Sequence, residues 1–134
     1  MPASPVLDSF ALLTFLRDEP GTDKVAAILE KARAREQPVH MTEVNYAEVQ
    51  YIVRRKDGEA AWRVVAGELI AMPIEFHPAD RTLADIAADL KTRFKLSLAD
   101  AFAAALAKTR NAELVTGDLE FKEVESEIKI SWLK

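Results

Sequence analysis

Four acidic residues could together hold a metal ion: Asp8, Glu43, Asp100 and Asp118. Asp8 and Asp118 each follow a short apolar segment, whereas Glu43 and Asp100 each stand in the first turn of a segment with helical spacing. Clustered carboxylates repel one another and raise one another's pKa unless a cation compensates, and hard oxygen ligands suit Mg²⁺ or Mn²⁺. We therefore predict a divalent metal site of a kind suited to phosphodiester hydrolysis.

Taken one at a time, these acids have ordinary structural explanations, because acidic side chains favour helix N-termini through capping and the helix macrodipole. The segment from Ser97 to Asp100 has the spacing of a capping box, Glu43 follows a threonine as in many helix starts, and Asp118 ends a turn. The hypothesis of a metal site therefore depends on all four acids meeting at one edge of the fold.

Two hydroxyl side chains, those of Ser9 and Thr116, are expected near the same edge, where they could orient a carboxylate or a water. Each has an equally good explanation as a turn residue. Mg²⁺ usually keeps several waters and takes only one or two direct carboxylates, so some of the acids are expected to act through water or as a base. His40 and His77 are not needed as ligands of this site, because the acidic set is complete.

The elements that must position these residues alternate between short apolar segments and longer segments with helical periodicity. The predicted strands cover residues 5–7, 39–41, 73–78, 113–116 and 128–133. The predicted helices cover residues 10–16, 23–35, 42–56, 59–72, 80–94 and 97–107.

This alternation favours parallel strand pairing through right-handed crossovers, and hence an α/β fold: a three-layer α/β/α sandwich with a short-stranded parallel sheet. Ligands of such sheets bind outside the carboxyl ends of the strands, which is the edge where Asp8 and Asp118 are predicted to lie. No linker, repeat or low-complexity tract interrupts the sequence. Residues 1–134 are therefore expected to form a single domain.

The composition is that of a globular protein, with 49% of the 134 residues hydrophobic and 30% charged. The chain contains no cysteine, which excludes disulfides, zinc-thiolate sites and thiol nucleophiles and suits a reducing compartment. The sequence shows neither the order of a signal peptide nor an apolar stretch long enough to cross a membrane. We expect a cytoplasmic protein without membrane contact.

The net charge of −4 argues at first against a nucleic-acid-binding protein, because phosphate contacts favour a basic surface. Of the 22 acidic residues, four are assigned to one pocket, and the remaining 18 balance the 18 lysines and arginines. Local patches therefore matter more than the total. Lys91, Arg93 and Lys95 precede the helix of Asp100 and are candidate contacts to RNA, although a solvated helix face explains them as well.

Four short motifs, in order along nearly the whole chain, resemble the successive signatures of PIN domains. They are residues 6–13 (VLDSFALL), 42–45 (TEVN), 96–101 (LSLADA) and 114–121 (LVTGDLEF). The resemblance is closest to the VapC toxins of bacterial and archaeal toxin-antitoxin pairs, and residues 122–133 resemble their closing helix and strand. Each motif alone is a weak signal, but four motifs in order at fitting separations make a strong one.

The resemblance implies an endoribonuclease that cuts RNA with Mg²⁺ or Mn²⁺ and leaves 5′-phosphate and 3′-hydroxyl ends. The acidic set that it implies is Asp8, Glu43, Asp100 and Asp118. It also implies a cognate antitoxin protein and a homodimer. The first helix is more apolar than one buried face requires, and either core packing alone or a groove for an antitoxin helix explains the excess at Phe10, Leu13, Phe15 and Leu16.

Three other functions compete with this one. A phosphorylatable receiver domain also gathers carboxylates and Mg²⁺ at strand ends, but it would need an aspartate after its central strand, and residues 73–78 contain none. A catalytically silent PIN-fold RNA-binding or scaffold subunit is disfavoured by the intact acidic set. The motifs do not distinguish a toxin from a housekeeping RNA-processing nuclease, and they do not identify the RNA that is cut.

Overall fold

Five short parallel strands form the centre of the structure, a computed structural model that describes residues 3–133. The strand order across the sheet is β3-β2-β1-β4-β5. From β1 the chain therefore builds outwards in one direction through β2 and β3, and later in the other direction through β4 and β5. The strands are β1 (Val6–Leu7), β2 (Val39–Thr42), β3 (Ile74–His77), β4 (Leu114–Thr116) and β5 (Ile130–Trp132).

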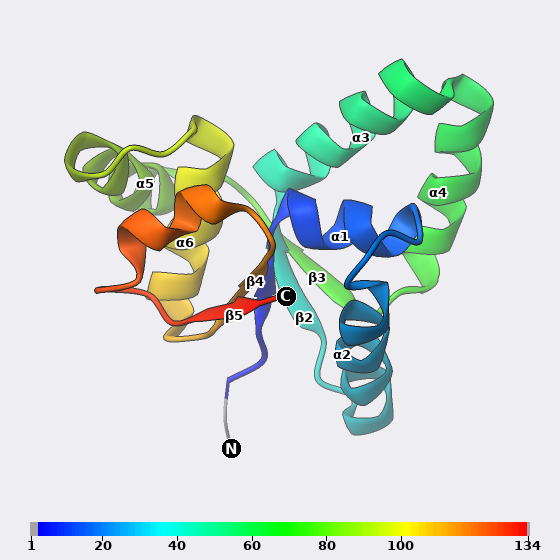
Figure 1. Cartoon of the computed structure of the whole chain (residues 1–134), viewed down its shortest axis with the longest axis horizontal. Helices are drawn as coiled ribbons and strands as arrows, with labels where there is room; N and C mark the ends of the chain where they lie inside the picture. The colour runs from blue at the N-terminus through cyan, green and yellow to red at the C-terminus, as the bar shows by residue number, and fades with distance from the viewer. Residues whose placement is uncertain (1–2, 134) are drawn as a thin grey trace.

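Helices cover both faces of this sheet. In Figure 1, α5 and α6 lie on one side of the strands and α1 to α4 lie on the other, so the predicted three-layer α/β/α sandwich is confirmed. The helices are α1 (Ser9–Leu16), α2 (Thr22–Arg35), α3 (Glu43–Asp57), α4 (Glu59–Ala71), α5 (Arg81–Arg93) and α6 (Leu98–Arg110), and η1 (Leu119–Val124) is a 3-10 helix.

The central strands are apolar on both faces, as expected for parallel strands that are covered on both sides. Val6 of β1 and Leu114 of β4 are register partners and pack with α5 and α6, whereas the next pair, Leu7 and Val115, packs with the helices of the other layer. All four side chains are at most 1% exposed. The carboxyl ends of β1 and β4 are thus held rigidly side by side.

The alanines of α6 let that helix lie close against the sheet, because their side chains are small. Every residue from Ala103 to Ala107 is buried against the sheet or the neighbouring helix. The N-terminal turn of α6, which carries Asp100, is thereby brought to the carboxyl ends of β1 and β4.

The predicted elements agree with the observed ones, with differences at their ends. The last strand is shorter than predicted, and a 3-10 helix precedes it where the resemblance implied a closing helix and strand. The first helix begins at Ser9, directly after the aspartate that caps it. Within residues 3–133, no helix is both long and apolar enough to cross a membrane.

Candidate metal centre

The candidate site lies where the order of the strands reverses, between β1 and β4. Asp8 is the first residue after β1, and Asp118 follows β4 after one intervening glycine. The backbone N–H of Asp8 donates to the carbonyl of Val115 at 3.4 Å, which extends the pairing of the two strands by one residue. Open parallel sheets bind ligands at such a reversal point, because the two flanking connections leave a crevice there.

The carboxylate of Asp8 is held by two hydrogen bonds at this point. Oδ1 accepts the backbone N–H of Ala11 at 2.8 Å, and Oδ2 accepts the hydroxyl of Thr116 at 2.5 Å. The same Thr116 oxygen accepts the backbone N–H of Asp118 at 2.9 Å. Thr116 therefore connects the first aspartate to the last one through a single hydroxyl oxygen.

Capping and site formation turn out to be compatible. Asp8 is the N-cap of α1, and Asp118 is the N-cap of η1, where its Oδ1 accepts the backbone N–H of Glu120 at 2.9 Å. Asp100 is not a cap, because Ser97 caps α6. Capping therefore explains the conformation of two aspartates but not the burial of Asp100, which is 8% exposed.

A third carboxylate joins Asp100 and Asp118. One carboxylate oxygen from each of Asp100, Asp118 and Glu120 lies within 4.8 Å of the others, which is close enough for one cation to bind all three. Glu120 was missed in the sequence, where it reads as a charged residue near the end of the chain. The turn that begins at Asp118 could have indicated Glu120, because this turn directs the Glu120 side chain back towards α6.

The two most buried aspartates hold their protons unusually tightly. The pKa of Asp8 is raised to about 7, chiefly by desolvation and also by the charges of Asp118 and Glu48, against the hydrogen bonds from Thr116 and Ala11. Desolvation also raises the pKa of Asp100 to about 8, together with the charge of Asp118, a hydrogen bond with Glu120 and the charge of Asp8. Asp8 and Asp100 are thus too desolvated, and too close to other carboxylates, to be fully ionised without a compensating cation.

The N-terminal part of α3 is tied to the site by Asn45, which is fully buried. Its Nδ2 donates to Ser9 Oγ at 3.1 Å and to the carbonyl of Ala99 at 3.3 Å, and its Oδ1 accepts the hydroxyl of Thr42 at 2.5 Å. One side chain thus connects α1, α3 and the first turn of α6. The hydroxyl of Ser9, a candidate for orienting a carboxylate or a water, donates to the carbonyl of Asn45 at 3.3 Å and holds α1 against α3.

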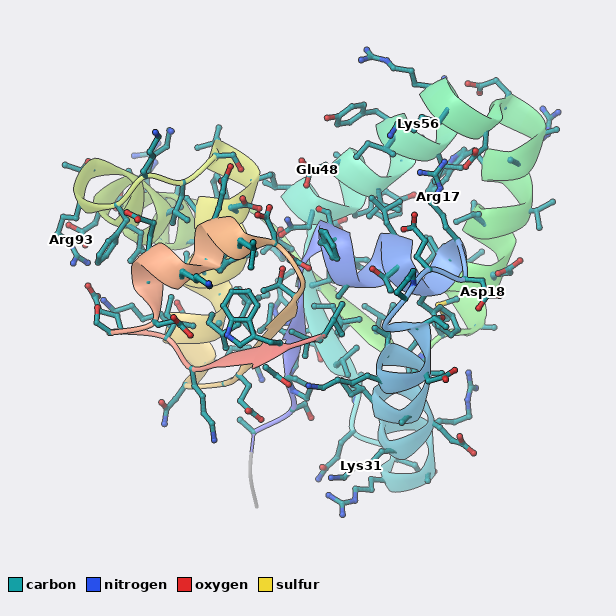
Figure 2. The ribbon with its side chains drawn as sticks, viewed as in Figure 1. Arg17, Asp18, Lys31, Glu48, Lys56 and Arg93 are labelled. Atoms are coloured by element: carbon teal, nitrogen blue, oxygen red, sulfur yellow. The ribbon has the colours of Figure 1, made fainter. Side chains whose placement is uncertain are left out.

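The acid that α3 directs towards the site is Glu48 rather than Glu43. Successive helical residues are about 100° apart, so Glu48, three residues after Asn45, lies on nearly the same face, whereas Glu43, two residues before it, lies about 200° away. Glu48 acts electrostatically on Asp8. Figure 2 shows Glu48 on the part of α3 near α1 and α6.

The structure does not bring Glu43 to the other three predicted acids. Its side chain is exposed and lines a hollow between α3, α4 and β3, together with Tyr46, Ile70 and Phe76. The predicted set therefore divides: Asp8, Asp100 and Asp118 meet at one edge, and Glu43 faces away from them. Position in the first turn of a helix was not a sufficient guide, because it does not say which way a side chain points.

The residues that meet at this edge fit a hard divalent cation. The donors are carboxylate oxygens without a thiolate or imidazole among them, which is the ligand chemistry that Mg²⁺ and Mn²⁺ favour. The raised pKa values of Asp8 and Asp100 show the electrostatic conflict that a cation would relieve.

Two of the basic residues that were considered for nucleic-acid contact are engaged within the protein. Arg93 bonds to Asp89 and Glu127, and Nζ of Lys91 donates to the carbonyl of Leu96 at 2.8 Å. Lys95 makes no ion pair within residues 3–133. Of the three, Lys95 is the one left available to a phosphate.

Comparisons with known proteins agree with the fold. The family model for the PIN domain matches residues 6–127. No curated protein sequence matches the chain. Among solved structures, VapBC2 of Rickettsia felis bound to a promoter DNA fragment has a TM-score of 0.76 at 21% identity, covering 95% of this chain and 96% of that one.

Two other solved structures are similar over most of their length. VapBC of Salmonella typhimurium bound to DNA has a TM-score of 0.77 at 16% identity and covers 100% of both chains. The toxin VapC20 of Mycobacterium tuberculosis, described as cleaving the sarcin-ricin loop, has a TM-score of 0.69 at 15% identity and covers 89% of this chain and 93% of that one. At these identities the likeness concerns the fold.

Proposed function

The chain belongs to the PIN domain family, and on that premise we propose that it is a metal-dependent endoribonuclease. The observation that carries the proposal is the meeting of Asp8, Asp100 and Asp118 at the reversal point of the sheet, with the pKa of the two most buried ones raised. A purely structural acid at a helix start has no need of acidic neighbours. Acids gathered at this place are instead suited to holding a cation against a phosphodiester.

We propose Asp8, Asp100 and Asp118 as the metal-binding acids, with Glu48 in the place first assigned to Glu43. A bound Mg²⁺ or Mn²⁺ would neutralise the carboxylates, polarise the scissile phosphate and make a water molecule more acidic. Thr116 keeps the Asp8 carboxylate in one orientation through its hydroxyl. Hydrolysis then adds water across the bond between phosphorus and the 3′ oxygen, leaving 5′-phosphate and 3′-hydroxyl ends.

Asp100 and Glu120 have different roles in this proposal. The raised pKa of Asp100, about 8, means that a bound cation would displace a proton from this carboxyl at neutral pH. Glu120 lies within reach of Asp100 and Asp118 and is exposed, so it can bind through water or accept a proton from an attacking water. The hydrogen bond from Thr116 to Asp8 joins the ends of β4 and β1, and the backbone N–H of Asp118 donates to the same Thr116 oxygen.

We further propose that the protein is the toxin of a toxin-antitoxin pair. The similar folds include VapBC complexes and a toxin described as cleaving the sarcin-ricin loop, which supports RNA as the substrate class and an antitoxin protein as the partner. A hollow between α1, α2 and α4 is lined by Phe15, Leu29 and Met72, with charged residues of α2 and α4 at its edge, and it is suited to an amphipathic helix. The proposed homodimer would bury Val64 and Ile70 of α4, which are 63% and 88% exposed.

Cleavage is expected to need the metal. The purified chain, incubated with structured and single-stranded RNA, should cut in the presence of Mg²⁺ or Mn²⁺ and lose all cleavage in excess chelator, because the carboxylates would otherwise repel the phosphate. Mapping the fragment ends identifies the RNA class and the bond that is cut. Cleavage that continues at an unchanged rate in chelator would contradict the metal role, and the absence of cleavage in every RNA tested would favour a silent subunit.

The two glutamates of α3 provide a matched pair for testing the site. Glu48→Gln is expected to lower the rate of cleavage by about 10- to 100-fold, the range observed when a group that supports a metal is lost. Glu43→Gln should leave the rate close to that of the wild type, because its side chain faces the hollow beside α4. Both substitutions keep the side-chain shape. The rates are measured with Mn²⁺ and a single RNA substrate. If Glu43→Gln lowered the rate and Glu48→Gln did not, Glu43 and not Glu48 would belong to the site.

A further inference from the structure

A second group of potential metal ligands lies on the sheet, at a distance from the acidic edge. His40 of β2 is the register partner of Glu75 of β3, and His77 follows Glu75 by two residues. Register partners in a parallel sheet point to the same face, and so do residues two apart on a strand, so all three side chains share the face covered by α5 and α6. No part of the nuclease proposal uses them.

The ligand atoms of these three side chains converge. Nδ1 of His40 lies 2.9 Å from Nε2 of His77, and the same Nε2 lies 3.3 Å from Oε2 of Glu75. One ligand atom from each of the three residues lies within 4.8 Å of the others. Donor atoms bound to one tetrahedral zinc ion, at bond lengths of about 2.0–2.2 Å, are separated by similar distances of roughly 3.3 Å.

The contact between the two rings places an unprotonated nitrogen within the group, where a metal ion could take the place of the shared proton. A hydrogen bond between two neutral imidazoles needs a proton on one nitrogen and none on the other, so at least one of the two facing nitrogens is bare. Neutral imidazole is the form that binds metals.

The surroundings admit an ion and offer it a partial countercharge. His40 and Glu75 both line an open hollow that continues past Pro38 to Thr109, so solvent reaches the group. Glu75 supplies one negative charge. Arg110, which lines the same hollow, opposes a cation, but its side chain is exposed, so solvent and salt screen its charge.

We propose that His40, Glu75 and His77 form a second metal site, which takes zinc or a similar transition metal rather than magnesium. Two imidazoles and one carboxylate form a three-ligand set of the kind that leaves the fourth zinc position to water. Imidazole donors disfavour Mg²⁺, whereas the acidic edge lacks imidazole and favours it. The two sites thus differ in their metal.

The two sites are also separate in space. Arg110 and Asp100 stand near opposite ends of α6, and ten helical residues span about 15 Å along the axis. A metal on the histidines would hold edge strand β3 to β2 without touching the acidic carboxylates. The proposal therefore does not depend on the nuclease activity.

Zinc binding can be followed at the ligands themselves, because the chain contains only 2 histidines. In excess Mg²⁺, one equivalent of Zn²⁺ is expected to shift the imidazole nitrogen resonances of both rings, and one equivalent of Co²⁺ to produce the visible absorption of a four- or five-coordinate site. His77→Gln should weaken Zn²⁺ affinity by about 100-fold or more, and Glu75→Gln by about 10-fold, by calorimetric titration. His77 is the better residue to replace, because His40 is buried and its loss could impair folding.

Asp100→Asn is the matched control, because it alters the acidic edge and leaves the histidines intact. Its Zn²⁺ affinity should equal that of the wild type, while its Mn²⁺ affinity falls. The proposal is overturned by any of three results: ring resonances that do not respond to zinc, equal zinc affinity in His77→Gln and wild type, or loss of zinc binding in Asp100→Asn. Circular dichroism of each variant establishes that it is folded before titration.

Discussion

Asp8→Asn and Asp100→Asn are each expected to lower the rate of metal-dependent RNA cleavage by about 100-fold or more, a loss typical of an electrostatic group that acts at the reacting phosphate. Both substitutions keep the shape of the side chain and remove its charge. Asparagine also caps helices well, so Asp8→Asn should still accept the backbone N–H of Ala11. The loss of activity would therefore report the charge and not the fold.

The chain contains a matched control for this experiment. Asp80 is the N-cap of α5, where its Oδ1 accepts the backbone N–H of Leu83 at 2.9 Å, and it lies outside the acidic edge. Asp80→Asn should leave cleavage near the wild-type rate. If Asp8 were only a cap, Asp8→Asn and Asp80→Asn would behave alike.

The same variants should differ in their toxicity to the cell. Expression of the wild-type chain without a partner is expected to arrest growth, and Asp8→Asn or Asp100→Asn to relieve the arrest, because toxicity on this proposal follows from RNA cleavage. Asp80→Asn should remain toxic. Growth arrest by Asp100→Asn at equal protein level, with full cleavage in the test tube, would remove this acid from the site.

The second large effect concerns stability without metal. The pKa of Asp8 in the folded chain is about 7 and that of Asp100 about 8, above the ordinary value of 3.8. The folded state therefore holds protons that the unfolded state has already released, and its stability falls as pH rises from about 4 to about 8. For each of the two carboxyl groups, the free energy of unfolding falls by about 1.4 kcal/mol per pH unit while the folded state holds the proton and the unfolded state has released it.

His40 acts in the opposite direction over the lower part of this window. Its pKa is lowered from 6.5 to about 4, so the folded state gains stability as pH rises from about 4 to 6.5. Measurements between pH 6.5 and 8 largely avoid this contribution, because His40 is then neutral in the folded state and at most half protonated in the unfolded state. In that range the free energy of unfolding in chelator should fall by about 1 kcal/mol or more for the wild type.

Asp100→Asn should reduce this pH dependence. In chelator at pH 8 the variant should also be more stable than the wild type, because it lacks a carboxylate whose ionisation destabilises the folded state. Metal at about a hundred times Kd should stabilise the wild type by about 2.7 kcal/mol and the variant much less. Urea denaturation at both pH values, with chelator and with Mn²⁺, measures each quantity. Equal pH dependence and equal response to metal in the two proteins would contradict a shared site.

Local patterns were sufficient to place two of the aspartates and the sheet itself. Asp8 directly follows an apolar strand and Asp118 follows another after one glycine, and the carboxyl ends of parallel strands lie along one edge whatever the details of packing. The alternation of strands and helices likewise determined the three-layer α/β/α class. Such features depend on near neighbours in the sequence.

The orientation of α3 could not be read in this way. Whether Glu43 or Glu48 faces the site depends on the rotation of the helix about its axis, which Asn45 sets through contacts to Ser9 and Ala99, 36 and 54 residues away. The approach of Glu120 to Asp100 also needs the folded turn after β4. Side-chain direction is a property of the packed helix rather than of its first turn.

The histidine group shows the same division in the sheet. The sequence alone determined that His40 and His77 lie in extended segments, since the strand pattern around each is local. Only the register of β2 against β3, which pairs His40 with Glu75, brought Nδ1 of His40 to 2.9 Å from Nε2 of His77. A shift of one residue would send one set of side chains to the opposite face, so tertiary packing, through the buried side chains that set the register, decided whether this group exists at all.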